Sequence, residues 1–188
     1  MAGLLDTTTS VSRRSIAQQL PFVLALMIVA GFAFAGGPGL ITAVWLAAVT
    51  PALVIFDIRH RRLPNVLVLP GAVTLLIDLS WSWAVLGALP LASILVVAVC
   101  LVLLLIMNVL GGLGMGDVKL AVVHCGCLGV VSPTQSALAL ILAFLLGGMA
   151  SVVLLVRGSA RGSRIPFGPF LLVGFWLAVV LLIPERSG

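Results

Sequence analysis

Charged residues are scarce in this sequence. Only five acidic and ten basic side chains occur among 188 residues, so 8% of the chain is charged, whereas 62% is hydrophobic. The mean hydropathy is +1.35. A soluble domain of this size has too little polar surface to cover so many apolar side chains. The composition therefore excludes a soluble enzyme and predicts an all-α, polytopic transmembrane helix bundle with the lipid bilayer as its surroundings.

Cysteine chemistry and nucleic-acid binding are poorly supported as well. The three cysteines lie in apolar segments and form no Cys-x-x-Cys pair. The "HCGC" at 124–127 contains metal-ligand residue types, but small thiols packed in a bundle are the simpler interpretation. The sequence pI is about 10.5, yet no basic patch is interleaved with stacking aromatics. We therefore expect no metal, no cofactor and no nucleic-acid partner.

Apolar segments bounded by Pro and Gly predict about seven membrane spans, with six or eight as alternatives. The segments are 20–36, 40–56, 66–80, 87–109, 118–131, 135–156 and 168–183. Two of them, 66–80 and 118–131, are short for the roughly 20 residues that a straight crossing needs. After the first of these, Trp81 and Trp83 favour an interfacial turn.

The same pattern predicts a single transmembrane domain. Residues 20–184 form this domain, 1–19 a cytoplasmic N-terminal tail and 185–188 a C-terminal tail. A signal peptide cleaved after Ala35 is the alternative interpretation of the first apolar segment.

Basic residues mark every second connection between the predicted spans. Nine of the ten belong to this set: Arg13, Arg14, Arg59, Arg61, Arg62, Lys119, Arg157, Arg161 and Arg164. The positive-inside rule therefore places these connections and the N-terminus in the cytoplasm, and the protein in the inner membrane. The sequence leaves the oligomeric state open.

Two aspartates lie where predicted spans meet cytoplasmic connections. Asp57 is in "VIFDIRHRRLPN" and Asp117 is in "LGGLGMGDVKLA", whereas Asp78 falls near the outer end of its span. The predicted topology brings Asp57 and Asp117 to one face at similar depth. Two adjacent carboxyls share a proton, so one can take a proton from water while the other gives one to a carbonyl oxygen. This is the chemistry of aspartic proteases.

Simpler interpretations exist for each acid alone. Asp117 also fits a plain interhelical turn, and Asp57 fits a helix-end acid neutralised by nearby arginines. The position of both acids at cytoplasmic junctions favours the catalytic interpretation.

Other candidates surround the two acids. Gly114 and Gly116 let the backbone turn and a substrate strand approach closely. Lys119 is a candidate for binding a substrate carboxylate or lipid phosphate, with a positive-inside anchor as the alternative. Pro166, Phe167 and Gly168, from "PFGPF", line the predicted cleft or form a plain entry turn.

Two further polar residues favour structural roles. We expect Asn65 to cap the span that begins at 66. His124, seven residues beyond Asp117, is expected to be a hydrogen-bonded histidine inside the bundle.

Three motifs resemble those of one known family. "FDIRHRRLPN", "GGLGMGDVKLA" and "RIPFGPFLLVG" are similar, in this order, to the type IV prepilin peptidases, membrane aspartic proteases of the Gly-x-Gly-Asp type. The resemblance implies that Asp57 and Asp117 are the catalytic pair. It also implies a prepilin-like membrane protein as substrate, cut after a Gly at the cytoplasmic edge of its apolar helix.

The chain also departs from the longer members of that family. Those members carry a cytoplasmic loop with paired Cys-x-x-Cys motifs that is associated with N-methylation. Here only "GGPG" at 36–39 separates the first two spans. The resemblance is therefore to short, peptidase-only members, such as those serving tight-adherence pili.

Two other functions are compatible with parts of the pattern. Broken helices with two acids also occur in small cation-coupled transporters, although a transporter site usually lies near the midplane between repeats. A non-catalytic pilus assembly factor would keep the fold and tolerate loss of either acid. Presenilin-like proteases share Gly-x-Gly-Asp, but the basic connection and "IPFGPF" favour the prepilin branch.

Overall fold

The described part of the chain is entirely helical. The computed structural model describes residues 13–60, 63–157 and 166–187, and no strand occurs in these ranges. Seven α-helices follow one another there: α1 (Arg13–Phe34), α2 (Leu40–His60), α3 (Asn65–Leu86), α4 (Leu91–Val109), α5 (Met115–Gly129), α6 (Pro133–Val156) and α7 (Gly168–Ser187). The prediction of an all-α bundle with about seven helices is confirmed.

Length and hydropathy identify most of these helices as membrane spans. Among the described residues, α2, α3, α4 and α6 are each long and apolar enough to cross a bilayer. The apolar parts of α1 and α7, Gln18–Phe34 and Gly168–Ile183, are shorter. Helix α1 already begins at Arg13, and α7 continues to Ser187, so both helices extend into the segments predicted as tails.

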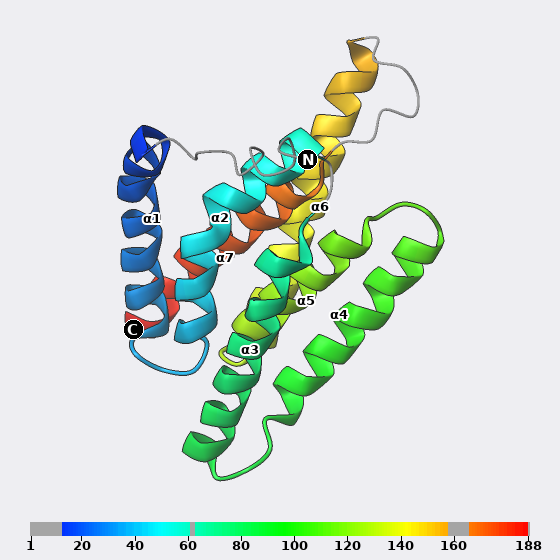
Figure 1. Ribbon diagram of the computed structural model, residues 1–188. Helices are drawn as coiled ribbons and strands as arrows, with labels where there is room; N and C mark the ends of the chain where they lie inside the picture. The colour runs from blue at the N-terminus through cyan, green and yellow to red at the C-terminus, as the bar shows by residue number, and fades with distance from the viewer. Residues whose placement is uncertain (1–12, 61–62, 158–165, 188) are drawn as a thin grey trace, which may run out of the picture.

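Consecutive helices run in opposite directions (Figure 1). The α1–α2, α3–α4 and α5–α6 connections lie towards one end of the bundle. The C-terminal ends of α2, α4 and α6 lie towards the other end, together with the N-terminal ends of α5 and α7. Arg59, Lys119 and Arg157 belong to this second end, hereafter the basic end. The alternation deduced from the basic residues therefore agrees with the arrangement of the helices.

Helix α5 is the central element of the bundle. It has only 15 residues, about 22 Å at 1.5 Å per residue. It packs against α2, α3, α4, α6 and α7, and side chains such as Leu120 and Leu128 are completely buried. Because the neighbouring helices surround it, this helix tolerates a length that is too short for an isolated span.

A close contact between α6 and α7 depends on small residues. A Cβ added at Gly174 would lie 2.5 Å from the Ala139 carbonyl oxygen and 3.0 Å from the Ala143 Cβ. In a bilayer, close helix packing of this kind is a main source of association, since lipid chains are as apolar as the side chains they replace.

The third helix is longer than predicted. The expected interfacial turn at Trp81 and Trp83 was wrong for these residues, because both lie in the last turns of α3, which reaches Leu86. The helix ends at Gly87, whose φ of +65° is a left-handed conformation that suits a residue without a Cβ.

The predicted cap at Asn65 was also wrong. Pro64 is the N-cap of α3, and no side chain among the described residues caps it. Asn65 is the first residue of the helix, and its Oδ1 accepts a hydrogen bond of 3.0 Å from Lys119 Nζ. The Asn65 side chain therefore bonds to Lys119 on α5, and not to the backbone at the start of its own helix.

Asp78 joins α3 to the N-terminal end of α2. The side chain is completely buried, and its Oδ2 accepts hydrogen bonds from the Thr42 N–H (2.8 Å) and the Thr42 hydroxyl (2.6 Å). Since α2 begins at Leu40, the Thr42 N–H is one of the first-turn donors that have no partner within the helix. Asp78 therefore caps α2 from a neighbouring helix.

Replacing Asp78 should destabilise the bundle. Asp78→Ala leaves two buried donors of Thr42 without an acceptor, and each such group costs about 1–3 kcal/mol. We expect the free energy of unfolding to fall by about 2 kcal/mol or more, and less for Asp78→Asn, which keeps one acceptor oxygen. Thermal or denaturant unfolding in detergent measures this difference.

Ser80→Ala is the matched control on the same helix. Its hydroxyl is exposed and bonds only to the Leu76 carbonyl, one turn back, so its removal should change stability little. Equal stability of the Asp78→Ala and Ser80→Ala variants would contradict the capping role.

Candidate active site

The two candidate catalytic acids lie at the basic end of the bundle. Asp57 is in the last turn of α2, and Asp117 is in the first turn of α5. These helices pack against each other, and the Asp57 carboxyl acts electrostatically on the Asp117 carboxyl. The fold thus brings together two acids that are 60 residues apart in the chain (117 − 57).

Asp57 is held by the N-terminal end of α7. Its side chain is only 3% exposed, and its Oδ2 accepts a hydrogen bond of 2.8 Å from the Gly168 N–H. Gly168 begins α7, so this N–H has no partner within the helix, and the positive end of the helix dipole favours a carboxylate there. The contact places the "PFGPF" segment directly against a candidate catalytic acid.

Only a glycine fits at position 168, because the Asp57 carboxyl leaves no room for a Cβ. A Cβ at this position would lie 2.7 Å from Asp57 Oδ2 and 3.1 Å from its Cγ. Any side chain would therefore displace the carboxyl or the start of α7.

Asp117 is positioned by its own helix start. Gly114 is the N-cap of α5, and its backbone N–H donates a hydrogen bond to the Asp117 carboxylate. This is the arrangement of an N3 acid that reaches back to the N-cap residue. The other oxygen, Oδ1, is buried and has no hydrogen-bond partner among the residues that the structure describes. This oxygen therefore keeps its capacity to accept a hydrogen bond.

The glycine-rich connection before Asp117 has a defined shape. Gly111 has a φ of +80°, a conformation that favours glycine. Asn108, near the end of α4, donates a hydrogen bond of 2.7 Å from Nδ2 to the Leu113 carbonyl. Sequence reasoning missed Asn108, and the available signal was an amide at the end of an otherwise apolar span.

Gly116 faces protein in this structure. A Cβ there would lie 2.9 Å from the Leu63 Cβ, so this glycine lets the α2–α3 connection pack on the first turn of α5. Gly114 has an extended backbone (φ −75°, ψ 146°). The proposed contact of both glycines with a substrate strand stays a prediction.

Lys119 links α5 to the start of α3. It donates its 3.0 Å hydrogen bond to Asn65 at the exposed edge of the basic end. Its predicted role in binding a substrate carboxylate or a lipid phosphate stays a prediction, and the bond to Asn65 fixes the position from which it would act.

Phe167 anchors the segment that precedes α7. Its ring packs against Phe144 of α6, with the ring centres 5.0 Å apart, and against Phe170 at 6.5 Å. Pro166, just before it, is partly buried. These contacts hold the segment close to the bundle where Gly168 meets Asp57.

The histidine and the cysteines lie inside the bundle. His124 is buried and stacks on Phe175 of α7, with ring centres 4.7 Å apart. The expectation that it is hydrogen-bonded was wrong for Nε2, which has no partner within the described ranges. Cys100, Cys125 and Cys127 are buried and free, as expected for packed thiols.

The comparisons with known proteins identify one family. The profile of the type IV leader peptidase family matches residues 40–152, more than half of the chain. A "Prepilin leader peptidase/N-methyltransferase" of Pseudomonas putida is 34% identical over 135 residues, which is 69% of this chain and 46% of the relative. The chain therefore spans less than half the length of that relative. No solved structure matches the chain.

The chain belongs to the type IV leader peptidase family. Its long apolar helices are those of a multi-pass membrane protein. The matched region contains both Asp57 and Asp117.

The contact between Gly168 and Asp57 should be essential for activity. Gly168→Ala places a methyl group against the carboxyl, and a displacement of about 1 Å at a reacting group costs on the order of 100-fold in rate. We expect cleavage of a type IV prepilin in detergent or proteoliposomes to fall by about this factor, while the variant remains folded.

Gly148→Ala is the matched control. Gly148 also lies in a helix near the basic end, but a Cβ there meets no described atom within 4 Å. Full activity of Gly168→Ala would show that Asp57 does not need the close approach of α7.

Proposed function

We propose that this protein is an aspartic endopeptidase that uses Asp57 and Asp117 to cleave the basic leader of type IV prepilin-like precursors. The observation that carries the proposal is the pairing of two acids at the basic end, one buried under the start of α7 and one with a free, buried oxygen. Membership of the leader peptidase family supplies the substrate class.

The proposed reaction needs only water and the two carboxyls. Two carboxyls that interact share one proton, so the pair contains an acid and a base together. The base takes a proton from water as the water oxygen attacks the carbonyl carbon of the scissile bond, and the acid protonates the carbonyl oxygen. Collapse of this intermediate breaks the C–N bond and passes a proton to the leaving amine, which returns the pair to its starting state.

The surroundings of the two acids suit this chemistry. Asp57 Oδ2 is occupied by the Gly168 N–H, so the carboxyl is held in one orientation. Asp117 keeps Oδ1 free in buried surroundings. The segments that precede α5 and α7, residues 110–114 and 166–167, are both non-helical, so each acid lies beside a break between helices.

We further propose that the basic end faces the cytoplasm, in the inner membrane. The distribution of Lys and Arg between the connections supports this orientation. A prepilin would then present its positively charged leader to the cytoplasmic side and its apolar helix to the bilayer. The scissile bond, at the start of that helix, would meet the acids at the membrane edge.

The proposal for this chain includes peptidase activity without N-methylation. The connection between α1 and α2 covers only residues 35–39, and the chain contains no Cys-x-x-Cys pair. A connection of this length is too short to fold as a domain that holds a methyl donor.

Asp57→Asn and Asp117→Asn should each abolish cleavage. The amide keeps the shape of the side chain and the acceptor oxygen, but it cannot pass a proton through the cycle. We expect a loss of at least about 1,000-fold in prepilin processing, with the elution profile and thermal stability in detergent close to wild type. Ser80→Ala, which is remote from the site, serves as the activity control.

Asp57→Glu and Asp117→Glu test how strictly the position of each acid matters. The extra methylene moves the acid by about 1 Å or more, so Asp→Glu variants should retain little activity. Complete processing by either purified Asn variant would remove that aspartate from the mechanism.

The mature product should leave with a free amino terminus. We expect no change in its mass when purified protein, prepilin and S-adenosylmethionine are incubated together, compared with a reaction without the methyl donor. Mass spectrometry of the mature product measures this. A gain of one methyl group that depends on the donor would refute the peptidase-only proposal and leave the dyad proposal intact.

A further inference from the structure

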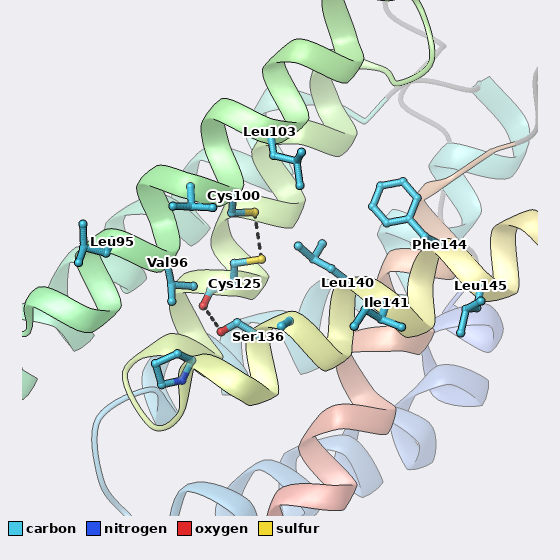
Figure 2. A pocket seen from close by; sticks show the side chains of 13 residues that line it. Leu95, Val96, Cys100, Leu103, Cys125, Ser136, Leu140, Ile141, Phe144 and Leu145 are labelled. Atoms are coloured by element: carbon cyan, nitrogen blue, oxygen red, sulfur yellow. Dashed lines mark hydrogen bonds between the residues drawn. The ribbon is translucent and has the colours of Figure 1, made fainter.

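An apolar groove opens between α4 and α6, away from the two acids. Its volume is about 680 Å³, and α5 forms its floor (Figure 2). Leu95, Val99 and Leu103 line it from α4, and Ala137, Leu140 and Ile141 line it from α6. Helices α4 and α6 each pack closely on α5, but they touch each other much less, and this divergence leaves the groove open.

The polar groups of the lining are already bonded to each other. Cys100 Sγ contacts Cys125 Sγ at 3.0 Å, and the Ser136 hydroxyl donates a hydrogen bond of 2.8 Å to the Cys125 carbonyl. Figure 2 shows both contacts at the floor. A bound group therefore gains nothing from hydrogen bonding here, and the lining selects for apolar surface.

Small side chains keep the groove open. Ala137, Cys125 and Ser136 stand where larger residues would fill the space. Close approach over small residues is the usual way in which helices pack in a bilayer. The stretch from Leu95 to Leu103 covers about 12 Å, or slightly more than two helical turns.

One side chain of the groove, Phe144, packs on the segment that holds the candidate active site. Phe144 lines its end nearest the basic end of the bundle, and the same ring packs on Phe167 at 5.0 Å. The next residue, Gly168, donates its N–H to Asp57. The floor helix also carries Asp117, eight residues before Cys125 (125 − 117), about 12 Å along the axis.

We propose that this groove binds the apolar transmembrane helix of the substrate, on the side that follows the scissile bond. The inference rests on the proposed peptidase function. A helix that lies on α5 between α4 and α6 and continues about 12 Å beyond Cys125 along the axis of α5 reaches the level of Asp117, where the bond before the helix must be cut. A lipid chain would bury the same apolar surface, but a lipid has no bond that must reach Asp57 and Asp117.

A photo-crosslinking experiment tests the occupant. A benzophenone amino acid replaces Ala137 in the groove or, as a control, Ala98, an exposed α4 residue outside the lining. Both are placed in Asp117→Asn protein in proteoliposomes with a full-length type IV prepilin. We expect a prepilin adduct at position 137 and at most a faint one at 98. Lipid adducts alone at 137, or equal prepilin adducts at both positions, would overturn the proposal.

Kinetics of Trp variants separate this proposal from the peptidase function itself. Ala137→Trp fills the groove and should raise KM for the prepilin by about tenfold, the equivalent of roughly 1.4 kcal/mol, with little change in kcat. Ala98→Trp should match wild type.

Wild-type cleavage with no effect of Ala137→Trp would refute the groove while the peptidase function stands. Absence of cleavage by wild-type protein would refute the peptidase function, and the groove proposal with it.

Discussion

The hydrogen bond from Gly168 to Asp57 is the contact on which the site depends. It joins residues 111 positions apart, and it exists because the first N–H of α7 has no partner within its own helix. A second bond between the same helices, from Trp176 Nε1 to Thr50 Oγ1 at 3.1 Å, fixes α7 along α2. With α7 held in this way, Phe167 reaches Phe144, a residue that lines the apolar groove.

Three parts of the structure depend on the short helix α5. Its first turn presents Asp117, its middle forms the floor of the groove through Cys125, and its buried faces pack against the helices around it. A central helix that is covered by protein does not need a full bilayer span of apolar residues. Leu75 of α3 packs closely against Gly126. This glycine therefore serves a contact with protein and not with lipid.

Buried carboxyls in this bundle are used in two different ways. Asp78 accepts two hydrogen bonds from Thr42 through one oxygen and joins α3 to the start of α2, which makes it a structural residue. Asp117 receives a backbone bond at one oxygen and leaves the other without a partner among the described residues. A buried polar group costs free energy unless it is paired, so an unpaired oxygen at a helix start is informative when a second acid lies beside it. Asp78 also leaves its Oδ1 without a partner among the described residues. The second acid beside Asp117, and not the unpaired oxygen alone, therefore distinguishes the acids proposed to act on substrate from the acid that caps a helix.

The sequence by itself determined the class of the fold, the alternation of the helices and the pair of acids. Hydropathy and the spacing of basic residues are local properties, and so are the three motifs that place Asp57 and Asp117 at span ends. Tertiary structure decided which partner each polar side chain finds. Asn65 bonds to Lys119 where a helix cap was predicted, Asp78 reaches Thr42 across a helix interface, and Asn108 shapes the loop before Asp117. Hydrogen bonds between distant helices and the groove between α4 and α6 depend on crossing geometry, and no local pattern of residues encodes that geometry.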